Sequence, residues 1–351
     1  MQAWISSFLF CKALQAKKEN RSTSLIHLPV IDSDILLTRY EPIKNRKNHP
    51  VILLHGLTRL GRDDPRIVEL KDALVSIGYS VYLPNFPEIA NHEMNNRIFD
   101  RLRTTFKTII EIHEQGNPVS IFAASYLGSA ALQVCIDESL KTSIKSICTI
   151  GSCYEFPDLL KEGMNCPIPD PYFVALLVKN ILIQKNEYSA PLAKAFDLIF
   201  ENLNQDKPLN TSELPFTGLN SYEIKLARNG TNREFLKKLF EKDSGNTFEP
   251  PCFNLKNTLP QIKAKVTLIH GEKDPIIFSH HAKRIAELLP KKQSHMLITP
   301  LLSHGDHSLR ISRLLEVFRC LKAFYFFFKY AEPEKNQQNK ILKNPISMKF
   351  T

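Results

Sequence analysis

The feature that most constrains the fold is a regular alternation, beginning near residue 25, of short apolar segments with longer amphipathic ones. In the longer segments apolar residues recur every three or four positions, which is the period of a half-buried helix. The strand-like segments are 24–31, 34–40, 49–56, 80–85, 118–125, 143–152, 263–271 and 295–300. We expect the first two to form a hairpin turning at residues 32–34. The alternation predicts an α/β fold with a mostly parallel central sheet and helices on both faces.

The alternation breaks between residues 155 and 259, where the apolar runs have helical length and prolines are frequent. The helices predicted there are 171–183, 191–203 and 233–242. Because the alternation resumes afterwards, we interpret this stretch as a helical cap inserted into one core. The predicted division is a 1–24 N-terminal segment that can form a peripheral helix, core parts at 25–155 and 261–330, a 156–260 cap, and a flexible basic 331–351 tail.

Composition and charge exclude several classes of protein. Hydrophobic residues make up 43% of the 351 and charged residues 23%, which excludes an intrinsically disordered chain. The formal net charge of +10 comes from 46 Lys and Arg against 36 Asp and Glu. The charges are scattered, with an excess near both ends, and no nucleic-acid-binding signature accompanies them. We therefore expect no nucleic-acid partner.

Cysteine usage and the chain ends bear on location. Seven irregularly spaced cysteines without a C-x-x-C pair predict neither a disulfide framework nor a zinc knuckle, and favour a reducing, cytoplasmic location. The N-terminal run AWISSFLF lacks the basic region and cleavage site of a secretory signal, and it is too short to span a bilayer. Membrane association through a short helix stays open. For the aromatic, basic segment 318–330 we weighed membrane docking and expect packing on the sheet.

The segment IFAASYLGSAAL holds the candidate nucleophile. An apolar strand ends, Ser125 follows, and a helix of small residues begins. Such a strand-to-helix turn exposes the serine oxygen above the carboxyl end of the sheet. The usual G-x-S-x-G pattern has Ala123 and Leu127 in place of its glycines. The alternative interpretation is an ordinary serine at a helix N-terminus.

A serine nucleophile needs a base, and the base needs an acid that orients it. Asp274 follows the strand VTLIHG, and His304 follows the last strand, in the order Ser, Asp, His. All three come at carboxyl ends of predicted strands, where ligands bind in such sheets. His307 is a rival for the base. Asp306 is a rival for the acid, but a residue two positions from His304 faces elsewhere.

An oxyanion hole supplies hydrogen-bond donors to the charge that develops on the substrate carbonyl. Its expected donors are the backbone amides of Tyr126, directly after the serine, and of Leu57, in the loop HGLTRLG. Gly56 lets this loop pass close to the nucleophile. We expect His55 to brace the loop by hydrogen bonding rather than to take a proton.

Other chemically suggestive residues have plainer interpretations. The histidine pair 280–281 lacks the spacing of a known metal motif, so we expect no metal and no cofactor. Cys148 and Cys153 flank a strand end and are expected to be packed thiols. The aspartate pair 63–64 precedes a proline and a helix-like segment, so helix capping explains it better than acid–base chemistry.

Together these motifs resemble the α/β-hydrolase superfamily over residues 25–330. HGLTRLG-RDDPR, followed by L-x-x-x-L-x-x-x-G-Y-x-V-x-x-P-N, is similar to a branch of largely uncharacterised bacterial hydrolases in which HGL…G…DDPR recurs. The resemblance implies a core sheet, a helical cap over the site, and a triad of Ser125, Asp274 and His304.

The predicted function is a serine hydrolase that cleaves carboxylic esters or thioesters through an acyl-enzyme on Ser125. The apolar helices of the cap favour a hydrophobic acyl group. Two alternatives stay open: an acyltransferase that uses the same triad, and a non-catalytic binding protein, because both glycines of the turn are replaced. The sequence predicts no oligomeric state.

Overall fold

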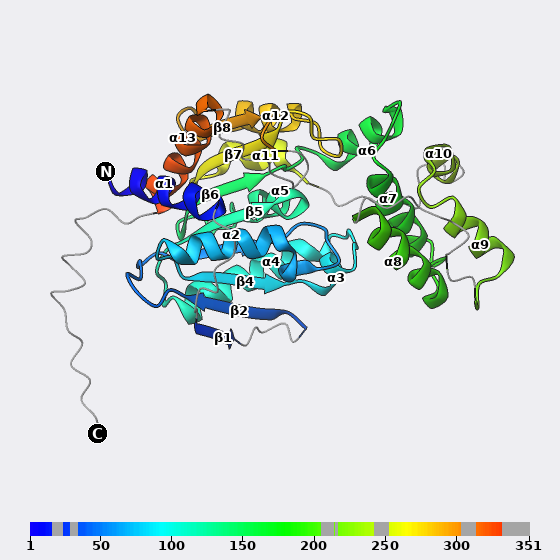
Figure 1. The fold of residues 1–351 in the computed structure, drawn as a ribbon, viewed down its shortest axis with the longest axis horizontal. Helices are drawn as coiled ribbons and strands as arrows, with labels where there is room; N and C mark the ends of the chain where they lie inside the picture. Colours follow the sequence, from blue (N-terminus) through cyan, green and yellow to red (C-terminus); the bar gives the residue numbers. More distant parts are fainter. Residues whose placement is uncertain are drawn as a thin grey trace, which may run out of the picture.

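Eight strands form one sheet in the computed structural model of the chain (Figure 1). The structure describes residues 1–15, 24–28, 34–204, 214, 217–241, 253–302 and 314–331. The strands are β1 (Ser24–Leu28), β2 (Leu36–Glu41), β3 (Val51–Leu54), β4 (Val81–Asn85), β5 (Val119–Ala124), β6 (Ile144–Ile150), β7 (Lys265–Gly271) and β8 (Ser294–Thr299). Their order across the sheet is β1-β2-β4-β3-β5-β6-β7-β8.

The pairing confirms the expected mostly parallel sheet. From β4 to β8 every neighbouring pair is parallel, and β2 is antiparallel to both β1 and β4. Strands β1 and β2 pair as predicted, from Ser24 opposite Glu41 to Leu28 opposite Leu37. Most of their predicted turn lies outside the described residues. The central strand β3 is buried along its whole length, as expected for a strand covered on both faces.

Local signals in the sequence fix the helix that follows β3. Helix α2 (Pro65–Ser76) begins after Asp64, whose carboxylate accepts a hydrogen bond from the amide of Arg66. Pro65 occupies the first helical turn, and Gly78, with a φ of +96°, follows the helix end. Asp64 is therefore a helix cap, as predicted.

Helices cover both faces of the sheet. One face carries α2 and α13 (Leu314–Ala331), with α1 (Gln2–Gln15) packed across both. The other face carries α4 (Arg97–Lys107), α5 (Ser125–Val134) and α12 (His280–Leu288). Helix α13 contacts β6, β7 and β8 and buries Phe324, Phe327 and Phe328, which confirms the expected packing of the aromatic segment on the sheet.

Between β6 and β7 the described residues form helices instead of strands. These cap helices are α6 (Phe156–Asn165), α7 (Pro171–Gln184), α8 (Ala190–Asn204), α9 (Ser221–Arg228) and α10 (Arg233–Glu241). They extend beyond one end of the sheet, on the right in Figure 1. Helices α6 and α9 were not among those predicted. The division into core and cap at residues 156 and 260 stays a prediction.

Candidate active site

Ser125 lies at the turn from β5 into α5, at the carboxyl end of β5. Its φ is +52°, in the left-handed region that side-chain-bearing residues rarely adopt. Such a conformation costs roughly 1–2 kcal/mol and persists only where the surrounding structure enforces it. The side chain is half-buried. A strained serine between a strand and a helix is the turn that the sequence predicted.

Close backbone contacts hold this turn. The Ser152 hydroxyl donates a hydrogen bond of 3.2 Å to the carbonyl oxygen of Ser125. A Cβ placed on Gly56 would lie 3.4 Å from the Cβ of Ser125, so the loop after β3 passes directly beside the serine. A Cβ on Gly128 would lie only 2.1 Å from the Ser152 hydroxyl oxygen. Helix α5 therefore approaches Ser152 closely at Gly128. Leu127, which stands where the usual motif has a glycine, is buried in the core instead.

Asp274 lies in the loop after β7 and is almost fully buried. Its Oδ1 accepts hydrogen bonds of 2.9 Å from the amides of Ile276 and Ile277. The His270 Nε2 donates to the carbonyl oxygen of Ile277 at 2.7 Å and lies 3.6 Å from Asp274 Oδ2. These contacts fix the carboxylate at the sheet edge. His270 could not be predicted as a site residue, because a histidine inside a strand has no distinctive spacing.

The strand order brings Ser125 and Asp274 to the same edge of the sheet. They follow β5 and β7, which flank β6 and run parallel to it. At about 4.8 Å between strands, their backbones are roughly 10 Å apart, a gap that one imidazole can bridge. The predicted base His304 and its rivals His307 and Asp306 lie outside the described residues.

The loop after β3 presents the peptide between Gly56 and Leu57 near the serine. The Nδ1 of buried His55 donates a hydrogen bond of 2.9 Å to the carbonyl oxygen of Gly56. The N–H of Leu57 belongs to this same peptide and points the opposite way, because a trans peptide is planar. His55 thus fixes the orientation of a proposed oxyanion donor. Tyr126, the other proposed donor, is the second residue of α5, where helix amides lack partners within the helix.

A cap residue braces the same loop. The Tyr172 hydroxyl, at the start of α7, donates to the carbonyl oxygen of Leu57 at 2.8 Å. It also lies 2.7 Å from the Nε2 of buried His92, which must donate because the single phenolic proton is used on Leu57. The His92 ring stacks on Phe200 of α8, with ring centres 4.2 Å apart. No local sequence pattern marks this contact, because Tyr172 and Leu57 are 115 positions apart.

The two buried histidines should make stability depend on pH. Burial lowers the pKa of His55 to about 4. Burial, together with the positive charges of Lys179 and Arg59, lowers the pKa of His92 to about 3. As the pH falls below about 6.5, the unfolded chain protonates these side chains and the folded chain does not. The free energy of unfolding therefore decreases, by up to about 1.4 kcal/mol per pH unit for each histidine.

The contribution of His55 can be measured separately with His55→Asn. The asparagine amide can still donate near the Nδ1 position but does not titrate. Urea unfolding at pH values from 7.5 to 5 should give a shallower loss of stability for His55→Asn than for the wild type. Parallel pH profiles for the two proteins would contradict a neutral, buried His55.

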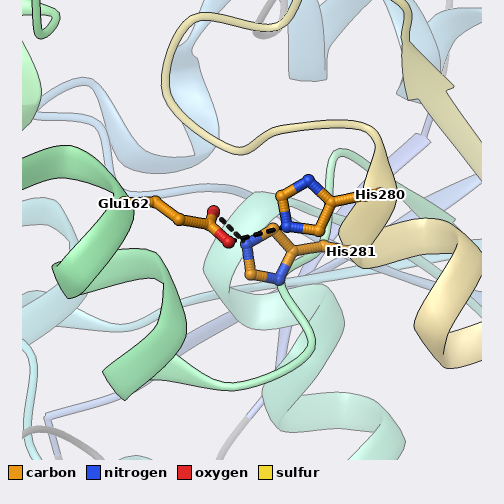
Figure 2. A group of neighbouring side chains, drawn as sticks. All are labelled: Glu162, His280 and His281. Carbon is orange, nitrogen blue, oxygen red and sulfur yellow. Dashed lines mark hydrogen bonds and ion pairs between the residues drawn. The ribbon is translucent and has the colours of Figure 1, made fainter. Parts of the chain in front are cut away.

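A second cluster links the cap to the core (Figure 2). Glu162 of α6 accepts hydrogen bonds from the Nε2 atoms of His280, at 2.7 Å, and His281, at 2.9 Å, both on α12. Arg284 and Asp158 join the same two helices by an ion pair of 2.5 Å. The two histidines are adjacent in the sequence and were weighed as metal ligands, whereas no sequence pattern marks their carboxylate partner, which lies 118 positions from His280.

The hydrogen bonds of this cluster favour a structural link between α6 and α12 over a metal site. The Nδ1 of fully buried His281 accepts a hydrogen bond of 3.1 Å from the amide of Tyr154. Its proton must therefore be on Nε2, the atom that faces Glu162. If a metal ion bound Nε2, the proton would have to be on Nδ1, where it would face the N–H of Tyr154 and the hydrogen bond would be lost. The donor set thus does not fit a metal ion.

The two cysteines near the site are packed thiols, as expected. Cys148 and Cys153 are fully buried. Burial raises the pKa of Cys153 to about 11, so its reactive thiolate form is disfavoured near neutral pH. The Ser129 hydroxyl donates to the carbonyl oxygen of Cys153 at 2.7 Å.

Comparisons with known proteins give similarity of fold only. No family model matches the sequence, and no curated protein matches it. A meta-cleavage product hydrolase from Pseudomonas fluorescens aligns over 88% of this chain and 99% of its own, at 15% identity and a TM-score of 0.48. An esterase from Pyrococcus furiosus aligns over 91% of this chain and 95% of its own, at 13% identity and a TM-score of 0.48. A thermophilic esterase from Thermogutta terrifontis aligns over 89% of this chain and 100% of its own, at 12% identity and a TM-score of 0.46.

The chain has the α/β-hydrolase fold that its sequence motifs predicted. The strand order with antiparallel β2, the helices α6 to α10 between β6 and β7, and the strained serine after β5 are together typical of this fold. The assignment rests on these features of the molecule. At such low identities the similar structures carry no information about its substrate.

Proposed function

We propose that the protein is a serine hydrolase of carboxylic esters or thioesters, with Ser125 as its nucleophile. The observation that carries the proposal is the left-handed backbone of Ser125 between β5 and α5. This backbone conformation puts the serine above the carboxyl end of the sheet and at the positive end of a ten-residue helix. A serine that only capped the helix would sit in ordinary extended backbone and would need no such strain.

In the proposed mechanism Ser125 Oγ attacks the substrate carbonyl and gives its proton to His304. Asp274 orients the imidazole and stabilises its charged form. The carbonyl oxygen, now negative, accepts hydrogen bonds from the amides of Leu57 and Tyr126. His304 then protonates the leaving alcohol or thiol, and water attacks the acyl-enzyme with His304 again as the base.

The rigidity of the site supports this assignment. Asp274 is held by two amides, and the Gly56–Leu57 peptide is held by His55 on one side and by Tyr172 beyond it. A preorganised hydrogen-bond donor does not need to reorient as charge develops on the substrate oxygen. Each oxyanion donor therefore stabilises the transition state by about 3–4 kcal/mol. The contacts that set this geometry come from both the core and the cap.

The proposed substrate carries a hydrophobic acyl group. The rings of Tyr172, His92 and Phe200 contact one another beside Leu57, and Phe200 and His92 are fully buried. The cap helix α7 is apolar, but most of its side chains are buried against neighbouring helices. The half-buried side chains of Tyr172 and Leu57, residues that lie in contact beside the serine, therefore support an apolar acyl chain better than the fully buried side chains do.

A series of p-nitrophenyl esters with increasing acyl chain length tests both parts of the proposal. We expect hydrolysis by the wild type, with kcat/KM rising by about three- to fourfold for each methylene that enters an apolar site, up to a limit. Ser125→Ala should hydrolyse none of the esters above background. Wild-type protein without activity on any ester would favour the non-catalytic alternative. A flat series would exclude a hydrophobic acyl pocket.

A further inference from the structure

An apolar surface lies on the opposite side of the molecule from the cap. It consists of side chains of α1 and the first turns of α13 that the structure leaves exposed. These exposed side chains, called here the α1–α13 patch, are Met1, Trp4, Ile5, Phe8, Leu9, Leu315 and Phe318. Phe8 is 59% exposed and Leu315 81%. A large group of exposed apolar side chains on one surface often marks a site of interaction with a protein or a membrane.

The patch is an ordered surface rather than a set of scattered side chains. On α1 its members recur at helical spacing, while the opposite side of the helix buries Phe10 against α13. The Trp4 ring stacks on Tyr325 of α13, with ring centres 4.3 Å apart, and also lies 6.4 Å from Phe318. Helix α1 is thus apolar on both sides, and the described part of the chain covers only one of them.

Exposed lysines follow the patch along both of its helices. Exposed Lys12 lies one turn beyond Phe8 on α1, and exposed Lys322 one turn beyond Phe318 on α13. The sequence adjoining α1, residues 12–21, contains four Lys or Arg against one Glu. The sequence from residue 329 to 351, which includes the end of α13, contains five Lys against two Glu. An apolar, Trp- and Phe-containing stripe with lysines at its margin is typical of a helix that lies in a membrane interface.

We propose that the α1–α13 patch docks on an anionic lipid surface and that the protein binds membranes peripherally. The apolar side chains would enter the headgroup boundary, and the lysines would contact lipid phosphates. A second copy of the chain fits the patch less well, because self-association would bring the two basic margins together. Among the described helices, none combines the length and apolarity needed to cross a bilayer.

The geometry separates docking from the proposed chemistry. Figure 1 places α1 and α13 at the left of the molecule and the cap helices at the right. A protein docked through the patch would keep the Ser125 end of the sheet away from the lipid. Loss of docking should therefore leave hydrolysis of a small soluble ester unchanged, so that membrane binding and catalysis can fail independently.

Vesicle co-sedimentation tests the proposal. Vesicles of phosphatidylcholine with 30% phosphatidylglycerol are compared with pure phosphatidylcholine at low and high salt. The wild type should bind the anionic vesicles, and high salt should weaken this binding. Phe8→Glu should weaken binding to the anionic vesicles at least about tenfold. The variant loses an aromatic ring that would enter the lipid, and it adds a negative charge that the anionic headgroups repel. The control is Ile112→Glu, an equally exposed apolar residue on another element, which should bind as the wild type does.

Three results would overturn the proposal. They are absence of wild-type binding to anionic vesicles, equal binding by Phe8→Glu and wild type, and a wild-type dimer in light scattering that Phe8→Glu dissociates without any effect on lipid binding. Circular dichroism of each variant confirms that it is folded, and p-nitrophenyl acetate hydrolysis is measured in parallel. A wild type that binds the anionic vesicles but does not hydrolyse esters would count against the proposed function and leave the docking surface intact.

Discussion

Ser125→Ala is expected to lower kcat/KM for ester hydrolysis by at least about 10⁴-fold, because it removes the atom that forms the acyl-enzyme. Alanine and serine have the same backbone requirements, so the strained turn at φ +52° should persist. Thermal unfolding should therefore show a folded variant with nearly wild-type stability. Initial rates over a range of ester concentrations measure the effect.

The matched control for this prediction is Ser129→Ala. Ser129 lies one helical turn further along α5, is buried, and donates to the carbonyl oxygen of Cys153. Its loss should cost about 1 kcal/mol of stability and leave kcat/KM within a few-fold of the wild type. If both serine variants lose activity equally, the effect comes from damage to α5 and not from loss of a nucleophile.

Asp274→Asn is expected to lower kcat by about 10³- to 10⁴-fold with little change in KM. Asparagine keeps an oxygen that can accept from the amides of Ile276 and Ile277, so the loop should keep its shape. The negative charge is lost, and with it the stabilisation of a protonated imidazole and the correct tautomer. The effect on kcat rather than KM identifies a group that acts in the transition state.

Asp63→Asn is a suitable control for Asp274→Asn. It makes the same chemical change at a highly exposed aspartate next to α2, and its activity should equal that of the wild type. A decrease of less than tenfold for Asp274→Asn would show that Asp274 is not the orienting acid. Another carboxylate, such as Asp306, would then be tested in the same way.

The sheet could be predicted from the sequence because buried parallel strands and amphipathic helices leave different hydrophobic periods. Ser125 and Asp274 could be placed at one edge because each follows a strand whose direction the alternation fixes. The consequence of Leu127 could not be predicted. Only the structure shows that Gly128, one residue further along α5, makes the close contact with Ser152.

Long-range contacts made by side chains accounted for the features that could not be predicted from the sequence. Tyr172 reaches Leu57 from the cap, and Glu162 reaches His281 from α6, with no local pattern that marks either pair. The N-terminal run AWISSFLF suggested a short helix, but its packing on α13 depends on Phe10 meeting aromatic rings more than 300 positions away. Such contacts depend on how the elements pack, which periodicity alone does not determine.

Covalent labelling of the serine tests the central claim most directly. The purified protein is treated with a fluorophosphonate, and mass spectrometry of the intact chain and its peptides then locates the adduct. We predict one adduct on wild-type protein, located on Ser125, with no adduct on Ser125→Ala and much slower labelling of Asp274→Asn. Unlabelled wild-type protein, or equal labelling of wild type and Ser125→Ala, would contradict the assignment of Ser125 as an activated nucleophile.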